Sequence, residues 1–426
     1  MGITVGAGAS LAFTPHLSRA LQQSGGAPKQ SSGKLIQRAI PSSGELLPII
    51  SFGPRPTDGP AIKAVLKTLV DNGGRVVDVL HGGPPGEQGA RTAASELGTQ
   101  NKLFWTTPLS VSVPLLPGHV GPEPKVEPAA VKAAMEEKFA TFKVPKIDLV
   151  MVGSGADMPT HLAVLREMKK AGRVRYIGVH HLAFPPNAPM PTFGPLESIM
   201  RNEPIDFIGT DYSVSDRRLE EKILPLARER KIGVMAYFPF DRRRIFERAS
   251  STPLPEWAAD FDARTWAQFF LKYVVSHPAV TVVRTGTTKA AHMLDNIGGG
   301  IGRLPDEATR KRMAELVDSL PPTPPAGPPP PQATQEPAVV LSAAVLDRYV
   351  GEYEYAAVGT IVTFRRDGDK LLMKSGNMPE GPLVARSETR FATPWGAPIE
   401  FQLDGEGKVT GAIVQQGPYR IPLEPK

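Results

Sequence analysis

Four side chains that exchange protons readily follow short apolar runs of this chain. Asp78 lies in the run at 75–79, His81 comes just after it, and His180 and His181 directly follow another run. An imidazole titrates near neutral pH, so a histidine beside a carboxylate suits general acid/base catalysis. We therefore treat Asp78, His81 and His180 as candidate catalytic residues.

Two other interpretations of these residues stay open. A metal ion could bind near Asp78, but adjacent residues on an extended segment point to opposite faces, so His180 and His181 cannot easily hold one ion. We predict no metal site. In the remaining interpretation none of these residues is catalytic, and Asp78 caps the glycine- and proline-rich loop that follows it.

A candidate anion site follows the apolar run at 280–284. Gly286 would let a ligand approach the backbone closely, and a helix that starts near Ala290 would direct its first N–H groups at an anion. Arg284 or His292 would add positive charge. The alternative is an ordinary loop with a capping threonine.

The elements that must position these residues alternate along the chain. Eight short apolar runs are separated by segments with helical periodicity, which is typical of parallel βα units. Eight strands close a barrel, and barrel enzymes keep their chemistry at the C-terminal strand ends. The sequence therefore predicts an α/β fold, a (β/α)8 TIM barrel. The expected strands are Ile49–Gly53, Arg75–Val79, Leu103–Thr107, Ile147–Val152, Val174–Val179, Phe207–Thr210, Gly233–Tyr237 and Val280–Arg284, and the expected helices are Ala61–Asn72, Val131–Phe142, His161–Ala171, Leu219–Arg230 and Thr265–Ser276.

Low-complexity segments suggest four parts. These are a leader at 1–33, the barrel at 34–319, a proline-rich linker at 320–340 and a small antiparallel β domain at 341–426. In the last part, alternating runs are separated by glycine turns. Its opening phrase, Leu346 to Tyr353, is similar to that of small β domains appended to exported bacterial hydrolases. We expect this part to be a packing or binding accessory without catalytic residues.

Composition excludes several classes of function. The 426 residues include no cysteine, which excludes thiol catalysis, disulfides and cysteine-based metal sites. The net charge of +6 is spread along the chain, so we predict no nucleic-acid binding, although a basic balance favours an anionic cofactor. No segment is apolar enough for stable membrane insertion. Residues 2–13 resemble the apolar part of an export signal but lack preceding Lys or Arg, so the chain is either exported to the periplasm or cytoplasmic.

Residues 34–319 resemble the aldo/keto reductase family. The resemblance rests on the phrases at 171–179, 223–234 and 280–296, with Leu304–Glu307 at the usual place after them. It implies NADPH bound at the C-terminal face of the barrel and hydride transfer to a small-molecule carbonyl substrate. In that family a Tyr gives the proton, a Lys and an Asp tune the Tyr, and a His orients the substrate.

Only the Asp of these four matches this chain, at Asp78. Gly83 stands where the Tyr is expected, Pro108 follows the strand that should end in the Lys, and Gly153 follows the strand that should end in the His. No tyrosine occurs between residues 34 and 170, so a shifted alignment restores nothing. The proton-donating part of the family's site is therefore predicted to be missing.

The cofactor-binding part is better kept. By resemblance, Thr287, Lys289 and Asn296 would hold the 2′-phosphate and adenine end, and Tyr212 would stack on the nicotinamide. Gly209 replaces the family's amide-binding Gln, and the pair at 180–181 replaces its Ser-Asn. The predicted cofactor residues are Tyr212, Arg284, Gly286, Thr287, Lys289 and Asn296.

Two kinds of function remain. The first is an NADP(H)-dependent carbonyl oxidoreductase that uses His81 or a water near Asp78. The second is a non-catalytic barrel, either a pseudoenzyme that binds a nucleotide or small ligand or a periplasmic scaffold for the β domain. Export would favour the second kind of function, because NADPH is a cofactor of the cytoplasm.

Overall fold

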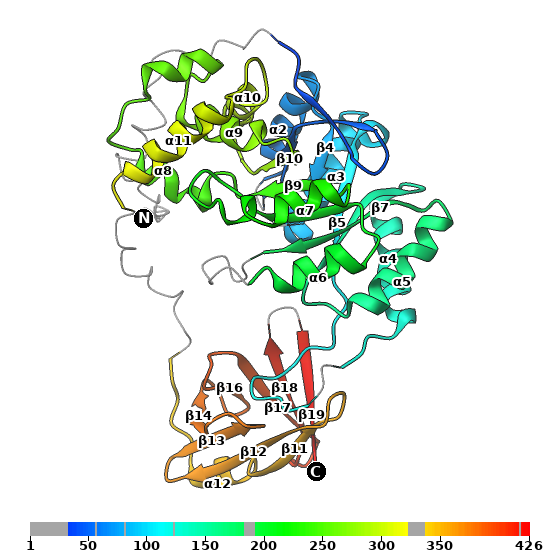
Figure 1. Cartoon of the computed structure of the whole chain (residues 1–426). Helices are drawn as coiled ribbons and strands as arrows, with labels where there is room; N and C mark the ends of the chain where they lie inside the picture. The colour runs from blue at the N-terminus through cyan, green and yellow to red at the C-terminus, as the bar shows by residue number, and fades with distance from the viewer. Residues whose placement is uncertain are drawn as a thin grey trace, which may run out of the picture. The chain divides into compact units, whose positions relative to one another are not determined.

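The computed structural model of this chain describes residues 33–55, 58–80, 82–121, 124–182, 192–322, 337–416 and 419–426. They form two compact units (Figure 1). We call residues up to 110 together with 128–325 the barrel unit, and residues 111–127 together with those from 326 onwards the β module. Nearly all of the predicted leader and most of the predicted linker lie outside the described residues.

Eight parallel strands close a barrel, which confirms the predicted fold. The strands follow one another around the barrel in the order β10-β3-β4-β5-β6-β7-β8-β9, and β10 pairs with β3 to close it. Every predicted strand lies within two residues of an observed one. Their bounds are β3 (Ile50–Phe52), β4 (Val76–Asp78), β5 (Phe104–Leu109), β6 (Ile147–Gly153), β7 (Val174–His181), β8 (Phe207–Asp211), β9 (Gly233–Tyr237) and β10 (Val280–Thr285).

Helices separate these strands, and the five predicted from periodicity are present. They are α2 (Gly59–Asp71), α4 (Pro128–Phe142), α5 (Met158–Lys170), α7 (Ile223–Glu229) and α9 (Trp266–Ser276). The barrel unit also contains α3 (Gly83–Glu96), α6 (Gly194–Asn202), α8 (Arg244–Arg248), α10 (Ala290–Gly298) and α11 (Glu307–Ser319), with the short 3₁₀ helices η1 (Gln100–Lys102), η2 (Arg218–Glu220), η3 (Asp241–Arg243) and η4 (Glu256–Phe261). No helix among the described residues is long and apolar enough to cross a membrane.

The expected loop after Asp78 is shorter than its composition suggested. Helix α3 starts at Gly83, and the proline pair that follows occupies its first turn. Proline is tolerated there because the first N–H groups of a helix have no partner inside the helix. The glycine- and proline-rich phrase therefore starts a helix instead of forming a long loop.

An unpredicted hairpin closes the N-terminal end of the barrel. Its strands are β1 (Gln37–Ala39) and β2 (Leu46–Pro48), which pair in antiparallel register. Leu47 packs in one core cluster with Val76 and Phe104, the first residues of β4 and β5. The ion pairs of Glu45 with Arg75 and Arg175 lie at the same end, so the hairpin and its neighbours occupy the N-terminal end of the barrel.

The predicted antiparallel β domain is also present. Helix α12 (Ala343–Asp347) leads into a nine-stranded sheet in the order β14-β13-β12-β11-β19-β18-β17-β16-β15. Aromatic side chains fill its core, where Tyr349 and Phe401 stack with ring centroids 4.2 Å apart. The strands are β11 (Gly351–Tyr355), β12 (Thr360–Asp367), β13 (Lys370–Ser375), β14 (Gly381–Pro382), β15 (Val384–Ala385), β16 (Arg390–Ala392), β17 (Pro398–Leu403), β18 (Val409–Gln416) and β19 (Tyr419–Pro425).

One segment of the barrel sequence packs inside the β module. Residues 111–127 connect β5 to α4, and the sequence reading assigned them to the barrel. Instead, Leu116 is only 2% exposed and belongs to the core of the β module. The sequence did not predict that this segment belongs to the β module, because its hydrogen-bond partners lie more than two hundred residues further along the chain.

Candidate functional site

The inward-facing side chains at the C-terminal strand ends define the candidate site. Asp78 ends β4, Tyr237 ends β9 and Arg284 is the penultimate residue of β10, before Thr285. All three are buried, with exposed fractions of 0%, 0% and 6%. They come from strands on both sides of the closure between β10 and β3, so the barrel brings together residues more than 200 positions apart.

Arg284 forms an ion pair with Asp78. Its Nε lies 3.1 Å from Oδ2 of the carboxylate, while Oδ1 accepts a hydrogen bond of 2.9 Å from the backbone N–H of Leu80. The guanidinium lies over Gly53, where an added Cβ would be 2.2 Å from its Cζ. Glycine at position 53 is therefore what leaves room for the arginine at the barrel mouth.

Tyr237 interacts with the same carboxylate. Burial and the negative charge of Asp78 raise the pKa of Tyr237 well above its usual value, and Arg284 offsets only part of this. Burial likewise raises the pKa of Asp78, against the lowering effect of Arg284. A phenol with a raised pKa is a weak proton donor, and none of the three side chains offers an open surface to a substrate.

Gly209 makes room for the Tyr237 ring. A Cβ at position 209 would lie 2.4 Å from Cε2 of Tyr237 and 2.8 Å from Cε of Met151. From the resemblance we predicted that Gly209 replaces the Gln with which aldo/keto reductases bind the nicotinamide amide. In this chain the corresponding space holds an aromatic ring from the neighbouring strand.

The candidate histidines have separate environments. The His180 ring lies beside Gly153. Burial, and to a smaller extent the charge of His181, lowers the pKa of His180 to about 4. His181 is buried and its Nδ1 lies 2.8 Å from the Ser154 hydroxyl. At neutral pH His180 is therefore uncharged and cannot serve as a general acid. His81 lies outside the described residues.

Tyr212 does not have the place predicted for it. Its hydroxyl donates a 2.5 Å hydrogen bond to Glu220 and accepts one of 3.0 Å from Arg310, and its ring packs beside Tyr273 and His277. The side chain is fully buried. A ring enclosed in this way has no free face for a nicotinamide, so the structure gives Tyr212 a packing role instead.

Positive charge gathers around the loop between β10 and α10. Gly286 is exposed, and a Cβ there would lie 3.5 Å from Nε of Arg55. Burial and the charges of Arg284 and Arg243 lower the pKa of Arg55. Burial and the charges of Lys289 and Arg243 lower the pKa of His292. Side chains from three separate parts of the chain thus place their cations close together.

Helix α10 starts within this basic cluster. Lys289 is its N-cap residue and no side chain caps its free N–H groups. Thr287 orders the approach, because its hydroxyl accepts a 3.1 Å hydrogen bond from the N–H of Lys289. Uncapped N–H groups and adjacent cations are the features that bind phosphate at helix N-termini. Asn296 lies in the last turn of the helix and is 4% exposed.

A second ion pair lies at the C-terminal end of β8. Arg242 Nη1 is 2.5 Å from Oδ2 of Asp211, and burial raises the pKa of Asp211 to about 6. The arginine comes from η3, where Asp241, Arg242 and Arg243 all have left-handed backbone angles, with φ of 44°, 51° and 80°. Non-glycine residues rarely adopt this conformation, so tertiary contacts such as the Asp211 pair must hold it.

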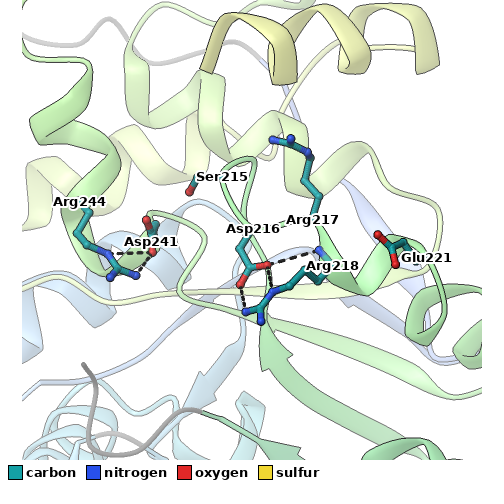
Figure 2. Close-up of a pocket in the computed structure, with 7 residues that line it drawn as sticks. All are labelled: Ser215, Asp216, Arg217, Arg218, Glu221, Asp241 and Arg244. Atoms are coloured by element: carbon teal, nitrogen blue, oxygen red, sulfur yellow. Dashed lines mark hydrogen bonds and ion pairs between the residues drawn. The ribbon is translucent and has the colours of Figure 1, made fainter. Parts of the chain in front are cut away.

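A polar cleft of about 510 Å³ lies beside this loop (Figure 2). Figure 2 shows two pairs among its charged side chains, Arg218 with Asp216 and Arg244 with Asp241. The N···O distances of these ion pairs are 2.7 and 2.5 Å. Arg217 pairs with Asp318. Its charges are therefore balanced, and the cleft includes none of the residues that the sequence predicted. Among the described residues, no cluster of three His, Asp or Glu side chains could hold a metal ion.

Comparison with known proteins identifies the barrel. A sequence profile of the Aldo/keto reductase family matches residues 54–314, more than half of the chain. The chain belongs to the aldo/keto reductase family. A profile described as a Domain of unknown function (DUF3471) matches residues 335–424, in the β module of this family member.

Its relatives are distant. "Probable aldo-keto reductase 1" of Glycine max is 25% identical over 237 residues, 47% of this chain and 63% of that protein. "Uncharacterized oxidoreductase YqkF" of Bacillus subtilis is 25% identical over 195 residues, 40% of this chain and 60% of that protein. The chain thus spans less than two thirds of the length of these two curated relatives.

Solved structures agree on the fold. The holo form of an aldo-keto reductase from Bacillus halodurans matches with a TM-score of 0.52 at 20% identity, covering 66% of this chain and 96% of that one. An aldo-keto reductase from Klebsiella pneumoniae in complex with NADPH matches with a TM-score of 0.51 at 17% identity, covering 71% and 98%. Both support the same barrel architecture.

Several residues of the site were not predicted from the sequence. Tyr237, Arg55 and Arg243 lie outside the predicted set, and Arg284 was expected at a cofactor instead of Asp78. One signal was available for Tyr237, because it ends a predicted strand and so had to lie near the same rim as Asp78. The run Arg242–Arg244 was visible as the densest positive charge, but its position beside α10 depends on the barrel closure.

Proposed function

We propose that the barrel of this aldo/keto reductase family member binds NADP(H) by its phosphate-bearing end and is a poor carbonyl reductase or none. The proposal rests chiefly on the basic cluster of Arg55, Arg243 and Lys289 at the uncapped start of α10. The charged groups that lower the pKa of Arg55 are the cations Arg284 and Arg243, although Asp78 pairs with Arg284. A bound phosphate would add negative charge beside these cations.

NADP(H) is favoured over NAD(H) because the two differ by one phosphate. A cluster of several cations gains most from the ligand with the additional dianionic group. Aldo/keto reductases use the loop that corresponds to the one between β10 and α10 to bind the 2′-phosphate. The similar Klebsiella structure is described as an NADPH complex. Lys289 and exposed Gly286 are the predicted residues best placed for this role, with Thr287 positioning the backbone.

The reacting end argues against efficient reduction. The family's Tyr, Lys and His positions carry Gly83, Pro108 and Gly153, none of which donates a side-chain proton. Asp78 is retained but fully buried and paired with Arg284. We therefore propose a nucleotide-binding pseudoenzyme, whose natural ligand could still be a small-molecule carbonyl compound bound beside the cofactor.

One observation supports a second candidate function, a slow reductase. Tyr237 is the tyrosine that interacts with Asp78 beside the Arg284 cation, which is the combination of phenol, carboxylate and cation that carbonyl reduction needs. It would act only if the barrel mouth opened, because Tyr237 is fully buried.

Export also stays a prediction, since the possible signal lies outside the described residues. Export would favour the non-catalytic function.

A nucleotide titration followed by tryptophan fluorescence tests the binding proposal. We expect saturable quenching by NADPH at sub-millimolar concentration and weaker binding of NADH. Lys289→Ala should weaken NADPH about tenfold or more through loss of a charge-assisted contact, with a smaller effect on NADH. Lys311→Ala, which removes an exposed cation of α11, is the matched control and should change neither. Absence of saturable quenching, or equal effects of Lys289→Ala on both nucleotides, would contradict the proposal.

A turnover assay separates the two candidates. NADPH oxidation by 4-nitrobenzaldehyde, a substrate that many carbonyl reductases accept, is followed by absorbance at 340 nm over a time on the order of hours. The pseudoenzyme predicts no turnover above the uncatalysed rate. Turnover that falls with Tyr237→Phe and with Asp78→Asn would establish the slow reductase instead.

A further inference from the structure

The β module contains a built seat for one segment of the barrel sequence. The segment Ser112–His119, here called the rim segment, follows β5, which ends at Leu109, and belongs to the compact β module (Figure 1, cyan). Leu116, Pro117, Gly118 and His119 all contact residues of that module. These contacts include side-chain packing, hydrogen bonds and one close approach of two backbones, which are the ingredients of a specific binding site.

Apolar contact anchors the middle of the rim segment. Leu116 is 2% exposed and lies in the same core cluster as Tyr353 and Phe401, and Val113 packs against that cluster. The next residues of the chain end this burial, since Val120 is 69% exposed. Among the described residues of 111–127, the contacts with this core cluster come from Val113 and Leu116.

Buried hydroxyls of the module depend on the rim segment for partners. Ser375 is 1% exposed and its Oγ donates a 2.7 Å hydrogen bond to the carbonyl of Pro117. Thr360 is 4% exposed and its Oγ1 lies 2.7 Å from Nδ1 of His119. Without the rim segment these polar groups would lose partners inside a folded core, which costs free energy.

Two glycines let the backbones meet. Gly118 has φ of +86°, and a Cβ there would lie 2.1 Å from the carbonyl oxygen of Ser375. On the module side Gly376 has φ of +53°, and its Cβ would lie 2.0 Å from the carbonyl oxygen of Gly118. The N–H of Asn377 donates a 2.9 Å hydrogen bond to that same oxygen. Any side chain at either glycine would prevent this approach.

The rim segment continues directly from a strand of the candidate site. Thr106 in β5 pairs with Asp78 in β4, and the carbonyl of Thr106 accepts a 3.0 Å hydrogen bond from the N–H of Val79. β5 ends at Leu109, only seven residues before Leu116. Only six residues, 110–115, therefore connect the end of β5 to the seated leucine.

We infer that the β module, the domain of unknown function, is a segment-binding domain whose ligand in this chain is the rim segment, and that its grip orders the barrel rim next to Asp78. The inference does not depend on nucleotide binding. It gives the module a role that its sheet alone does not reveal, namely to hold the loop between β5 and α4.

Hydrogen–deuterium exchange on the full chain tests this inference without any ligand. Leu116→Ala should raise exchange in residues 112–119 by about tenfold or more, because truncating a buried leucine costs more than the free energy of a tenfold change. A smaller increase should reach Val79, Leu80 and the end of β5. Val120→Ala, in the same loop but exposed, is the matched control and should leave both regions unchanged.

A milder variant guards against loss of the whole module. Ser375→Ala removes only the hydrogen bond to Pro117 and should raise exchange in the same peptides by a smaller factor. Fluorescence of Trp395, the tryptophan of the module, reports whether the module stays folded. Exchange in 112–119 that is equal in all variants would overturn the inference, as would increases that stop within the module and never reach β5 or Val79.

Discussion

The carboxylate of Asp78 and the guanidinium of Arg284 form a buried ion pair across the closure of the barrel, with Nε 3.1 Å from Oδ2. One partner ends β4 and the other lies near the end of β10, so the pair joins the first half of the barrel to its last strand. Asp78, which the resemblance matches to the family's Asp, is thus paired with an arginine that we predicted to bind the cofactor.

Replacing Arg284 should destabilise the barrel strongly. Arg284→Met leaves the buried Asp78 carboxyl without its counter-charge, which typically costs about 3–5 kcal/mol. Denaturant unfolding followed by tryptophan fluorescence would measure the change, since three of the four tryptophans, Trp105, Trp257 and Trp266, lie in the barrel unit.

A second ion pair provides the control for this experiment. Arg303 also pairs with an aspartate, Asp262, but its side chain is 66% exposed, so Arg303→Met should cost no more than about 1 kcal/mol. The double variant Asp78→Asn with Arg284→Met should recover part of the loss. Equal costs for Arg284→Met and Arg303→Met would show that the buried pair is not what holds the rim.

Gly209 should not tolerate even one added carbon. Gly209→Ala would place its Cβ 2.4 Å from the Tyr237 ring, and such overpacking costs about 1–3 kcal/mol. Gly155→Ala is a suitable comparison, because no atom lies within 4 Å of a Cβ there. Thermal unfolding should show a lowered Tm for the first variant only. A Tm unchanged by Gly209→Ala would mean that Tyr237 is free to leave its place.

Asp211 should give the barrel a measurable pH dependence. Its pKa is raised to about 6 from an ordinary 3.8, so between these values the folded state binds more protons than the unfolded state. Stability contributed by Asp211 is therefore fully present below pH 3.8 and is lost as the pH rises from there through 6, by about 3 kcal/mol in total.

The difference between the wild type and Asp211→Asn isolates this effect. Groups that do not interact with Asp211 contribute equally to both proteins, whereas the loss of the Arg242 partner shifts the variant by a constant. We expect the unfolding free energy of the wild type, relative to the variant, to fall over this range. A difference that rises or stays flat with pH would contradict the raised pKa.

The regular parts of the molecule could be predicted from the sequence. Apolar runs such as Gly233–Tyr237 became strands at the predicted residues, because burial on both faces leaves a continuous apolar signal in a parallel sheet. Lys289 and Gly286 were likewise found in the loop before α10, since a strand, a glycine and a helix start are local features.

The pairing of side chains across the barrel could not be predicted. Whether Arg284 turns toward Asp78 or toward a cofactor depends on the space above Gly53, which only the closed barrel defines. Tyr212 was misplaced for the same reason, because its partners Glu220 and Arg310 come from η2 and α11. The rim segment is the extreme case, with a seat formed by residues beyond the linker.

Tyr212→Phe separates packing from cofactor binding. Removing the hydroxyl leaves Glu220 and Arg310 without one partner each, which should lower stability by about 1–2 kcal/mol. NADPH affinity should stay within a factor of about two of the wild type, because the buried ring makes no contact with the nucleotide and keeps its shape in the variant. The bulkier change Tyr212→Leu, read at a temperature where the protein is still folded, removes the ring itself. A marked loss of NADPH affinity with the leucine variant, at unchanged far-UV circular dichroism, would restore Tyr212 to the cofactor site and require its ring to turn outward from its present contacts.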